Sequence, residues 1–104
     1  MIYNLSTTIL IPGKMAEYYD LATKELIPLY PKIGMKAVGS FRPLTGNMNE
    51  TYALYVYDDL AAFQKITVAR MKDRDFQNVS AKMSALRVSQ SSTLLEPNAW
   101  SPMK

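Results

Sequence analysis

Polar side chains that could hold a ligand recur at alternate positions in two segments rich in β-branched and aromatic residues. They are Asn4, Ser6 and Thr8 in the segment 2–11, and Tyr55 and Tyr57 in the segment 51–57. Alternate residues of a strand share one face of a sheet, so each set would point the same way. A tyrosine hydroxyl titrates at about pH 10, so it would donate a hydrogen bond to a phenolate or carbonyl but is a poor base at neutral pH. These residue types favour binding over catalysis, and no catalytic residue is assigned.

A further candidate is Arg42, at the end of the segment 35–42, whose planar donor fork could hold an anionic substituent. Each candidate also has a purely structural interpretation. Arg42 could be solvated at the surface, and the tyrosines could pack with their hydroxyls satisfied locally. Asn4 and Ser6 could hydrogen-bond each other across neighbouring strands, because buried polar groups need partners. The residues alone leave both interpretations open.

The chain contains no histidine and no cysteine. Ser-His-Asp and Cys-His catalysis, His-ligated zinc or haem, and cysteine-ligated metal centres are therefore excluded within the chain. Carboxylates and methionine rarely form a transition-metal site without them, so we expect no metal and no cofactor. A chain without disulfides fits a reducing compartment, and we predict a cytoplasmic location.

Twelve Lys and Arg against nine Asp and Glu give a formal charge of +3. The densest basic stretch, 65–74, is interrupted by Asp73 and is more typical of a solvated helix face than of a phosphate-binding patch. No apolar stretch approaches the roughly 20 residues of a membrane span, and the first residues lack the pattern of a secretion signal. We therefore expect no nucleic-acid partner and no membrane span.

The length of 104 residues predicts one domain, 1–104. Hydrophobic spacing and turn residues predict strands at 2–11, 35–42, 51–57 and 88–95. One helix is expected between the first two strands and two helices between the last two. This order, βαββααβ, is typical of the split βαβ arrangement, an α+β fold in which four antiparallel strands form one sheet with the helices on one face.

Local signals refine these elements. Pro28 and Pro31 should fray or kink the first helix near Ile27, because proline lacks the amide donor. Candidate N-caps of the later helices are Asp58 or Asp59, and Asp73. The second helix is expected to bury Leu60, Phe63, Ile66 and Val68. Trp100 is expected to dock the tail 98–104.

The third predicted strand is apolar on both alternations, with Tyr52, Leu54 and Val56 on one and Ala53 among tyrosines on the other. A sheet with helices on one side only would expose one of these faces to water. We therefore predict a homodimer in which a second copy covers the helix-free face.

Several stretches together resemble the NIPSNAP family of dimeric α+β barrel (ferredoxin-like) proteins, nearly from end to end. They are Ile2-Tyr3 with Leu5, Pro12-Gly13-Lys14, the run Ile33 to Phe41, Gly46 to Asn49, Tyr57 to Leu60, Asp73 to Phe76, Leu94 to Pro97, and Ser101-Pro102. The resemblance departs from the family pattern at Ala53 and Tyr55, where the family tends to carry His and Trp, so a mechanism that needs that histidine is not implied. It also departs at Asn4, Ser6 and Thr8, where the family tends to carry charged residues and tyrosine.

The resemblance implies a cleft between sheet and helices, because barrels of this type often bind small aromatic or lipophilic molecules there. On this basis the candidate ligand-binding residues are Tyr55, Tyr57, Asn4, Ser6 and Arg42. Two other functions stay open: a cofactor-independent monooxygenase or isomerase of the barrel type, and a protein–protein interaction module. Bound aromatic ligand would favour the first two functions over the third, and turnover would single out the enzyme.

Overall fold

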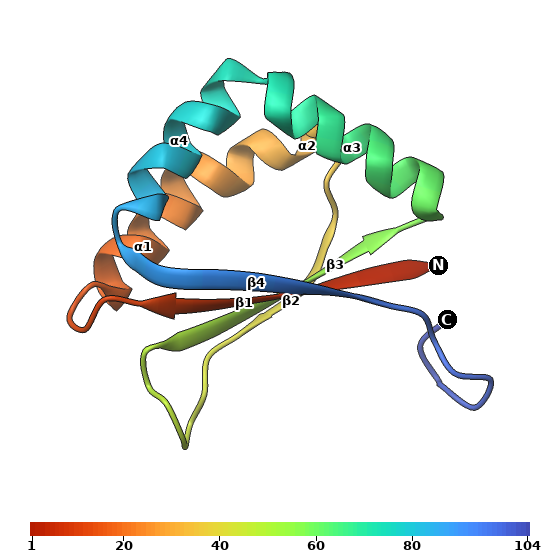
Figure 1. Ribbon diagram of the computed structural model, residues 1–104, viewed down its shortest axis with the longest axis horizontal. Coiled ribbons are helices and arrows are strands. Elements are labelled where there is room, and N and C mark those ends of the chain that lie inside the picture. The colour runs from red at the N-terminus through yellow and green to blue at the C-terminus, as the bar shows by residue number, and fades with distance from the viewer.

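The computed structural model describes residues 1–104 and has the expected order of elements. The strands are β1 (Ile2–Leu10), β2 (Ala37–Phe41), β3 (Glu50–Tyr57) and β4 (Arg87–Leu95). The helical elements are α1 (Met15–Leu21), η1 (Ala22–Leu26), η2 (Ile27–Leu29), α2 (Tyr30–Ile33), α3 (Leu60–Lys72) and α4 (Arg74–Ser84). The helices form one layer over one face of the sheet, which confirms the predicted α+β fold class (Figure 1).

The four strands form one antiparallel sheet in the order β2-β3-β1-β4. Its register is fixed by long ladders, with Asn4 of β1 opposite Tyr55 of β3 and Thr8 opposite Thr51. On the other side of β1, Thr8 lies opposite Gln90 of β4. The polar residues that alternate along β1 and β3 therefore lie beside one another on a single face of the sheet.

The first helical segment changes its winding where the prolines occur. The α-helix α1 gives way at Ala22 to the π-helical turn η1, and η1 is followed by the 3₁₀ turn η2, which contains Pro28. Gly34, with φ of +92°, ends α2 in the left-handed conformation that glycine adopts without strain. The predicted kink near Ile27 is confirmed, and the irregular turns lie over the sheet (Figure 1).

Aspartates begin both of the later helices, as predicted. The Asp59 carboxylate accepts a hydrogen bond from the Ala62 amide at 2.7 Å, and the Asp73 carboxylate accepts one from the Phe76 amide at 2.8 Å. The expected buried face of α3 is wrong in part, because Leu60 and Val68 are 60% and 41% exposed. α3 instead turns Phe63 and Ile66 toward the rest of the protein, and both are half-buried.

The hydrophobic core lies between the sheet and the helices in two clusters. The larger cluster comprises Leu10, Tyr18, Val79, Met83 and Leu86. The smaller comprises Tyr30, Ile33 and Met35. No helix is both long and apolar enough to span a bilayer.

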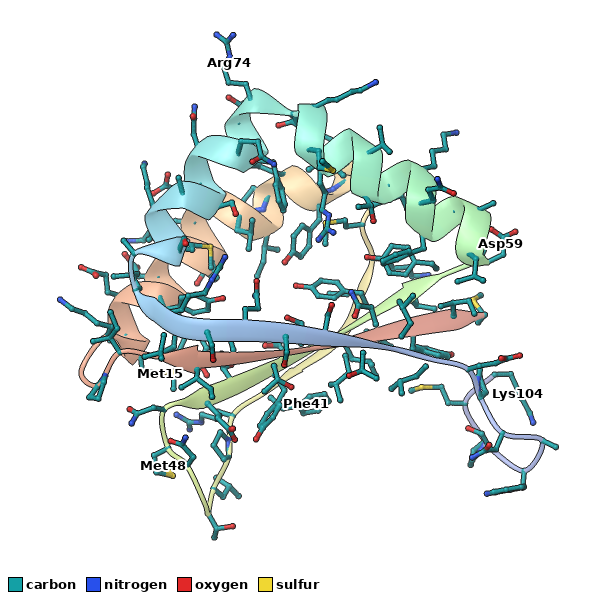
Figure 2. The ribbon with its side chains drawn as sticks, viewed as in Figure 1. Met15, Phe41, Met48, Asp59, Arg74 and Lys104 are labelled. Carbon is teal, nitrogen blue, oxygen red and sulfur yellow. The ribbon has the colours of Figure 1, made fainter.

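The opposite sheet face carries no helix. Phe41 projects from it on the side away from the helices and is 56% exposed (Figure 2). The C-terminal tail reaches this face, where the Tyr3 hydroxyl donates a hydrogen bond to the Lys104 carbonyl at 3.1 Å. Trp100 does not dock the tail, contrary to expectation, because its side chain is 82% exposed and the Tyr3 contact ties the tail down instead.

Candidate functional site

A cavity of about 340 Å³ lies between the sheet and the helices. Its floor is a row of small residues that crosses all four strands at one register position. These are Ser40 on β2, Ala53 on β3, Ser6 on β1 and Ser92 on β4. Side chains this short do not reach the helix layer, so the space above them stays open. Exposed residues at both sheet edges, Ala37 and Gln90, belong to the lining, so the cavity communicates with solvent.

Three of the five predicted ligand-binding residues, Tyr55, Asn4 and Ser6, line this cavity. Tyr57 faces the helices but lies outside the lining, because its ring packs edge-on against Phe63 with 5.1 Å between ring centroids. Arg42 also lies outside the lining; it is exposed just beyond the end of β2. The structure thus brings Asn4, Ser6 and Tyr55 together around the cavity and leaves both Tyr57 and Arg42 outside its lining.

A pair of tyrosines forms the polar centre of the cavity. The Tyr30 and Tyr55 hydroxyl oxygens are 2.8 Å apart, and the two rings meet edge to face with centroids 5.8 Å apart. Burial raises the pKa of Tyr30 far above its ordinary value, and the neighbouring Tyr55 adds to the shift. Burial likewise raises the pKa of Tyr55. Both hydroxyls therefore stay protonated across the physiological range and cannot serve as bases.

The arrangement of this pair leaves one proton free. Each hydroxyl carries one proton, and the bond between the two oxygens uses only one of them. The second proton is available to an acceptor in the cavity. The pair is therefore a hydrogen-bond donor toward any ligand oxygen that reaches it.

Hydroxyl and amide groups at the other end of the cavity are largely satisfied within the chain. The Tyr19 hydroxyl donates to Thr51 Oγ1 at 3.0 Å, and the Thr51 hydroxyl donates to the Phe41 carbonyl at 3.2 Å. The Gln90 amide donates to Thr8 Oγ1 at 3.0 Å and to Ser6 Oγ at 3.4 Å. These bonds hold the sheet end of the cavity in a fixed polar arrangement.

Asn4 is the exception. The residue is only 6% exposed, and its buried side-chain oxygen has no hydrogen-bond partner. Asn4 and Ser6 do not hydrogen-bond each other, since Ser6 is engaged by Gln90 and the two residues are successive on the same face of one strand. An orphaned buried amide oxygen is unusual and costs free energy, so Asn4 is poised for a partner that the chain does not supply.

The sequence interpretation missed the two charged residues of the lining, Arg70 and Arg87. The Arg70 guanidinium lies over the Phe76 ring, 5.9 Å from its centroid, and this contact turns it inward from α3. Helical spacing could have found Arg70, because it lies seven residues after Phe63 and so on the same helix face. No sequence pattern points to Tyr30, because Pro28 and Pro31 on either side of it indicate only a break in the helix.

The fold and the cavity define an α+β protein of the ferredoxin-like class, with an open space between sheet and helices. A family model described as NIPSNAP matches residues 3–102, and the chain belongs to the NIPSNAP family. A search of curated proteins finds no match to this chain.

Solved structures agree with this assignment. A NIPSNAP family protein from Agrobacterium tumefaciens is similar at 24% identity and a TM-score of 0.91, over 99% of this chain and 90% of that one. A NIPSNAP domain protein from Burkholderia xenovorans is similar at 20% identity and a TM-score of 0.91, over 98% of this chain and 99% of that one. More distantly, a putative antibiotic biosynthesis monooxygenase from Caulobacter crescentus shares 16% identity and a TM-score of 0.73, over 93% of this chain and 89% of that one. At these identities the likenesses concern the fold.

Proposed function

We propose that the chain binds one small, partly aromatic molecule in the cavity between sheet and helices. The observation that carries this proposal is the Tyr30–Tyr55 pair, which keeps a spare proton inside an open cavity of about 340 Å³. That volume falls within the range of small-molecule sites. Fourteen of the 26 lining residues are hydrophobic, and the rings of Phe63 and Phe76 are among them, so the apolar body of a ligand would be accommodated as well.

A binding role fits the chemistry of the lining better than a catalytic one. The raised pKa values of Tyr30 and Tyr55 make the pair a donor and remove it as a general base. Tyr57, predicted as a ligand residue, would act here by supporting Phe63 rather than by touching the ligand. Arg42 has no part in the proposed site.

The alternative activity is a cofactor-independent monooxygenase or isomerase. It is favoured by the distant structural likeness to proteins named as antibiotic biosynthesis monooxygenases. In that case the tyrosine pair would hold the substrate's oxygen, and the reactive electrons would come from the substrate itself. Consumption of a bound ligand in air, with product released, would distinguish this activity from binding alone.

Denaturing mass spectrometry of molecules that co-purify with the folded protein tests the proposal. The expected result is a small aromatic or lipophilic compound that is retained by the wild type and depleted in Tyr55→Phe. Tyr3→Phe is the matched control, because Tyr3 lies on the opposite sheet face and bonds only the tail. A protein that purifies empty and binds no member of an aromatic panel would contradict the proposal and favour the interaction module.

We also propose that the protein is a homodimer whose helix-free sheet faces meet. Phe41 is 56% exposed there, and Leu95 is 41% exposed beside Tyr3 in the register. A second copy would remove this apolar surface from water. The cytoplasmic location predicted from composition stays a prediction.

A further inference from the structure

All charged groups that line the cavity are cationic. The lining contains two arginines, Arg70 and Arg87, and no aspartate, glutamate or lysine. The two arginines lie at opposite ends of the cavity. Arg87 pairs with Leu10 near one end of β1. Arg70 lies over Phe76, which packs against the same cluster as Tyr55, and Tyr55 pairs with Asn4 near the other end of β1. The electrostatic character of the cavity is therefore uniformly positive.

Neither arginine is neutralised within the chain. The ion pairs of the structure join lysines 24, 32 and 82 to carboxylates, and neither arginine takes part in one. Arg70 is half-buried, and its contact is the face of Phe76. A half-buried guanidinium without a counter-ion has lost part of its hydration and has no anion in return. It is thus prepared to bind an anion that enters the cavity.

Arg70 and the tyrosine pair belong to the same end of the cavity. The Arg70 guanidinium lies over the ring of Phe76, and Phe76 and Tyr55 both pack against the cluster that contains Tyr30. Arg70 and both tyrosines line the same cavity. The guanidinium supplies a fork of donors, and the tyrosine pair supplies one more. Only the oxygens of an acceptor group satisfy donors of this kind. A carboxylate, planar and singly charged, matches one guanidinium together with one neutral hydroxyl.

Asn4 adds a second, independent requirement. Its unpartnered buried oxygen lies on the strand position opposite Tyr55, and it needs a donor. A carboxylate cannot supply one, but a hydroxyl next to the carboxylate can. The same end of the cavity thus offers donors for an anion and an acceptor for a neighbouring hydroxyl.

From these observations we infer that the ligand is an aromatic hydroxycarboxylate, with its carboxylate held by Arg70 and the tyrosine pair and its hydroxyl donating to Asn4. This inference rests on the proposed binding function and specifies its ligand class. The ring of the ligand lies in the apolar part of the cavity beside Phe76 and Met35.

Calorimetric titration with three matched probes tests the inference: 2-naphthylglycolate, 2-naphthylacetate and the neutral 2-naphthylacetamide. The glycolate carries its hydroxyl on the saturated carbon next to the carboxylate, where it is free to donate to Asn4. The naphthylglycolate should bind most tightly, and the naphthylacetate should bind at least tenfold more tightly than the amide. Raising the salt concentration should weaken the two carboxylates and not the amide.

Arg70→Gln should reduce the affinity for both carboxylates at least tenfold and change that for the amide less than threefold. Unchanged amide binding also shows that the variant is folded. Arg74→Gln is the matched control, because Arg74 is exposed and points away from the sheet (Figure 2). Asn4→Leu should remove the advantage of the naphthylglycolate over the naphthylacetate and leave the naphthylacetate itself bound.

The outcomes separate the two proposals. If all three probes bind equally and Arg70→Gln changes nothing, the binding function stands and the anionic ligand class is refuted. If the carboxylates are preferred but Arg74→Gln weakens them as much as Arg70→Gln does, the preference is a general charge effect and the assigned role of Arg70 is wrong. If no probe binds at millimolar concentration, the cavity does not take aromatic ligands and both proposals fall.

Discussion

Removing either hydroxyl of the Tyr30–Tyr55 pair is the sharpest test of how the cavity is built. Tyr30→Phe deletes one oxygen of a 2.8 Å hydrogen bond and leaves the ring, which is only 8% exposed, in place. Tyr55→Phe deletes the other oxygen. Neither change opens a new void, so the effect reports the polar contact itself rather than repacking.

The magnitude follows from what each single variant leaves behind. A typical buried hydrogen bond contributes about 1 kcal/mol net, and a buried hydroxyl without a partner costs about 1–3 kcal/mol. The cavity is open enough for water to reach the remaining hydroxyl, so we expect the lower end, about 1 kcal/mol for each single variant. For a chain of this length that corresponds to a fall in melting temperature of roughly 4–8 °C.

The double variant should be less destabilised than the sum of the singles, because replacing both partners by apolar rings leaves no orphaned group. We expect a coupling free energy of about 1 kcal/mol between the two positions. Urea unfolding followed by circular dichroism, at one fixed protein concentration, measures all four proteins of the cycle. Trp100 fluorescence is unsuitable, since that side chain is already exposed. Additive single effects would refute a direct bond between the hydroxyls.

Three further predictions concern pH, assembly and cavity volume. The folded protein holds the proton of Tyr30 more tightly than the unfolded chain does. The contribution of Tyr30 to the free energy of unfolding should therefore be constant below about pH 10 and fall above it, by up to about 1.4 kcal/mol per pH unit. Tyr30→Phe should flatten the alkaline slope, and an unchanged alkaline profile would contradict the assignment. Sedimentation should give twice the chain mass for the wild type and a weaker dimer for Phe41→Glu, whereas a wild-type monomer at high micromolar concentration would exclude the proposed assembly. Ala53→Leu should abolish ligand binding and raise the melting temperature, as thermal unfolding with and without ligand would report.

The fold was predictable because its signals are local. Pro12-Gly13 ends the first strand region, the aspartates at 59 and 73 cap helices, and alternation along β1 and β3 puts Asn4 and Tyr55 on one face. Each of these depends on neighbours within a few residues, where sequence patterns are most reliable. The α+β class follows from the same patterns, whereas the family is indicated by the resemblance of several short stretches and shown by the family model over residues 3–102.

Only those site residues that alternate along a single strand could be predicted from the sequence. Tyr55 was found by alternation, but its partner Tyr30 is 25 residues away in a helix broken by prolines, and no local pattern joins the two. Arg42 was proposed because it follows a strand, whereas the cavity takes its positive charge from Arg70 on α3 and from Arg87. Which of several arginines faces the sheet depends on how the helices are laid across it, and this is set by tertiary packing.

The cavity results from the alignment of small residues across the sheet, which the sequence of a single strand does not reveal. Its floor is the row Ser40, Ala53, Ser6 and Ser92, which the register aligns across four strands. Within its own strand each of these small residues carries no particular signal. Aligned across the sheet, their short side chains leave an open space beneath the helices. A chain selected for stability alone would fill this band, since each buried methylene contributes about 0.8 kcal/mol.

Ala53→Leu adds roughly three such groups to the middle of the floor, and the open volume of about 340 Å³ can receive them without overpacking. The expected gain is therefore up to about 2 kcal/mol of stability, at the expense of ligand binding. Ala53→Ser, which nearly preserves the size of the side chain, should change neither property and serves as the control. If Ala53→Leu instead destabilises the protein, the space above the floor is not open in solution, and the proposed binding site loses its physical basis.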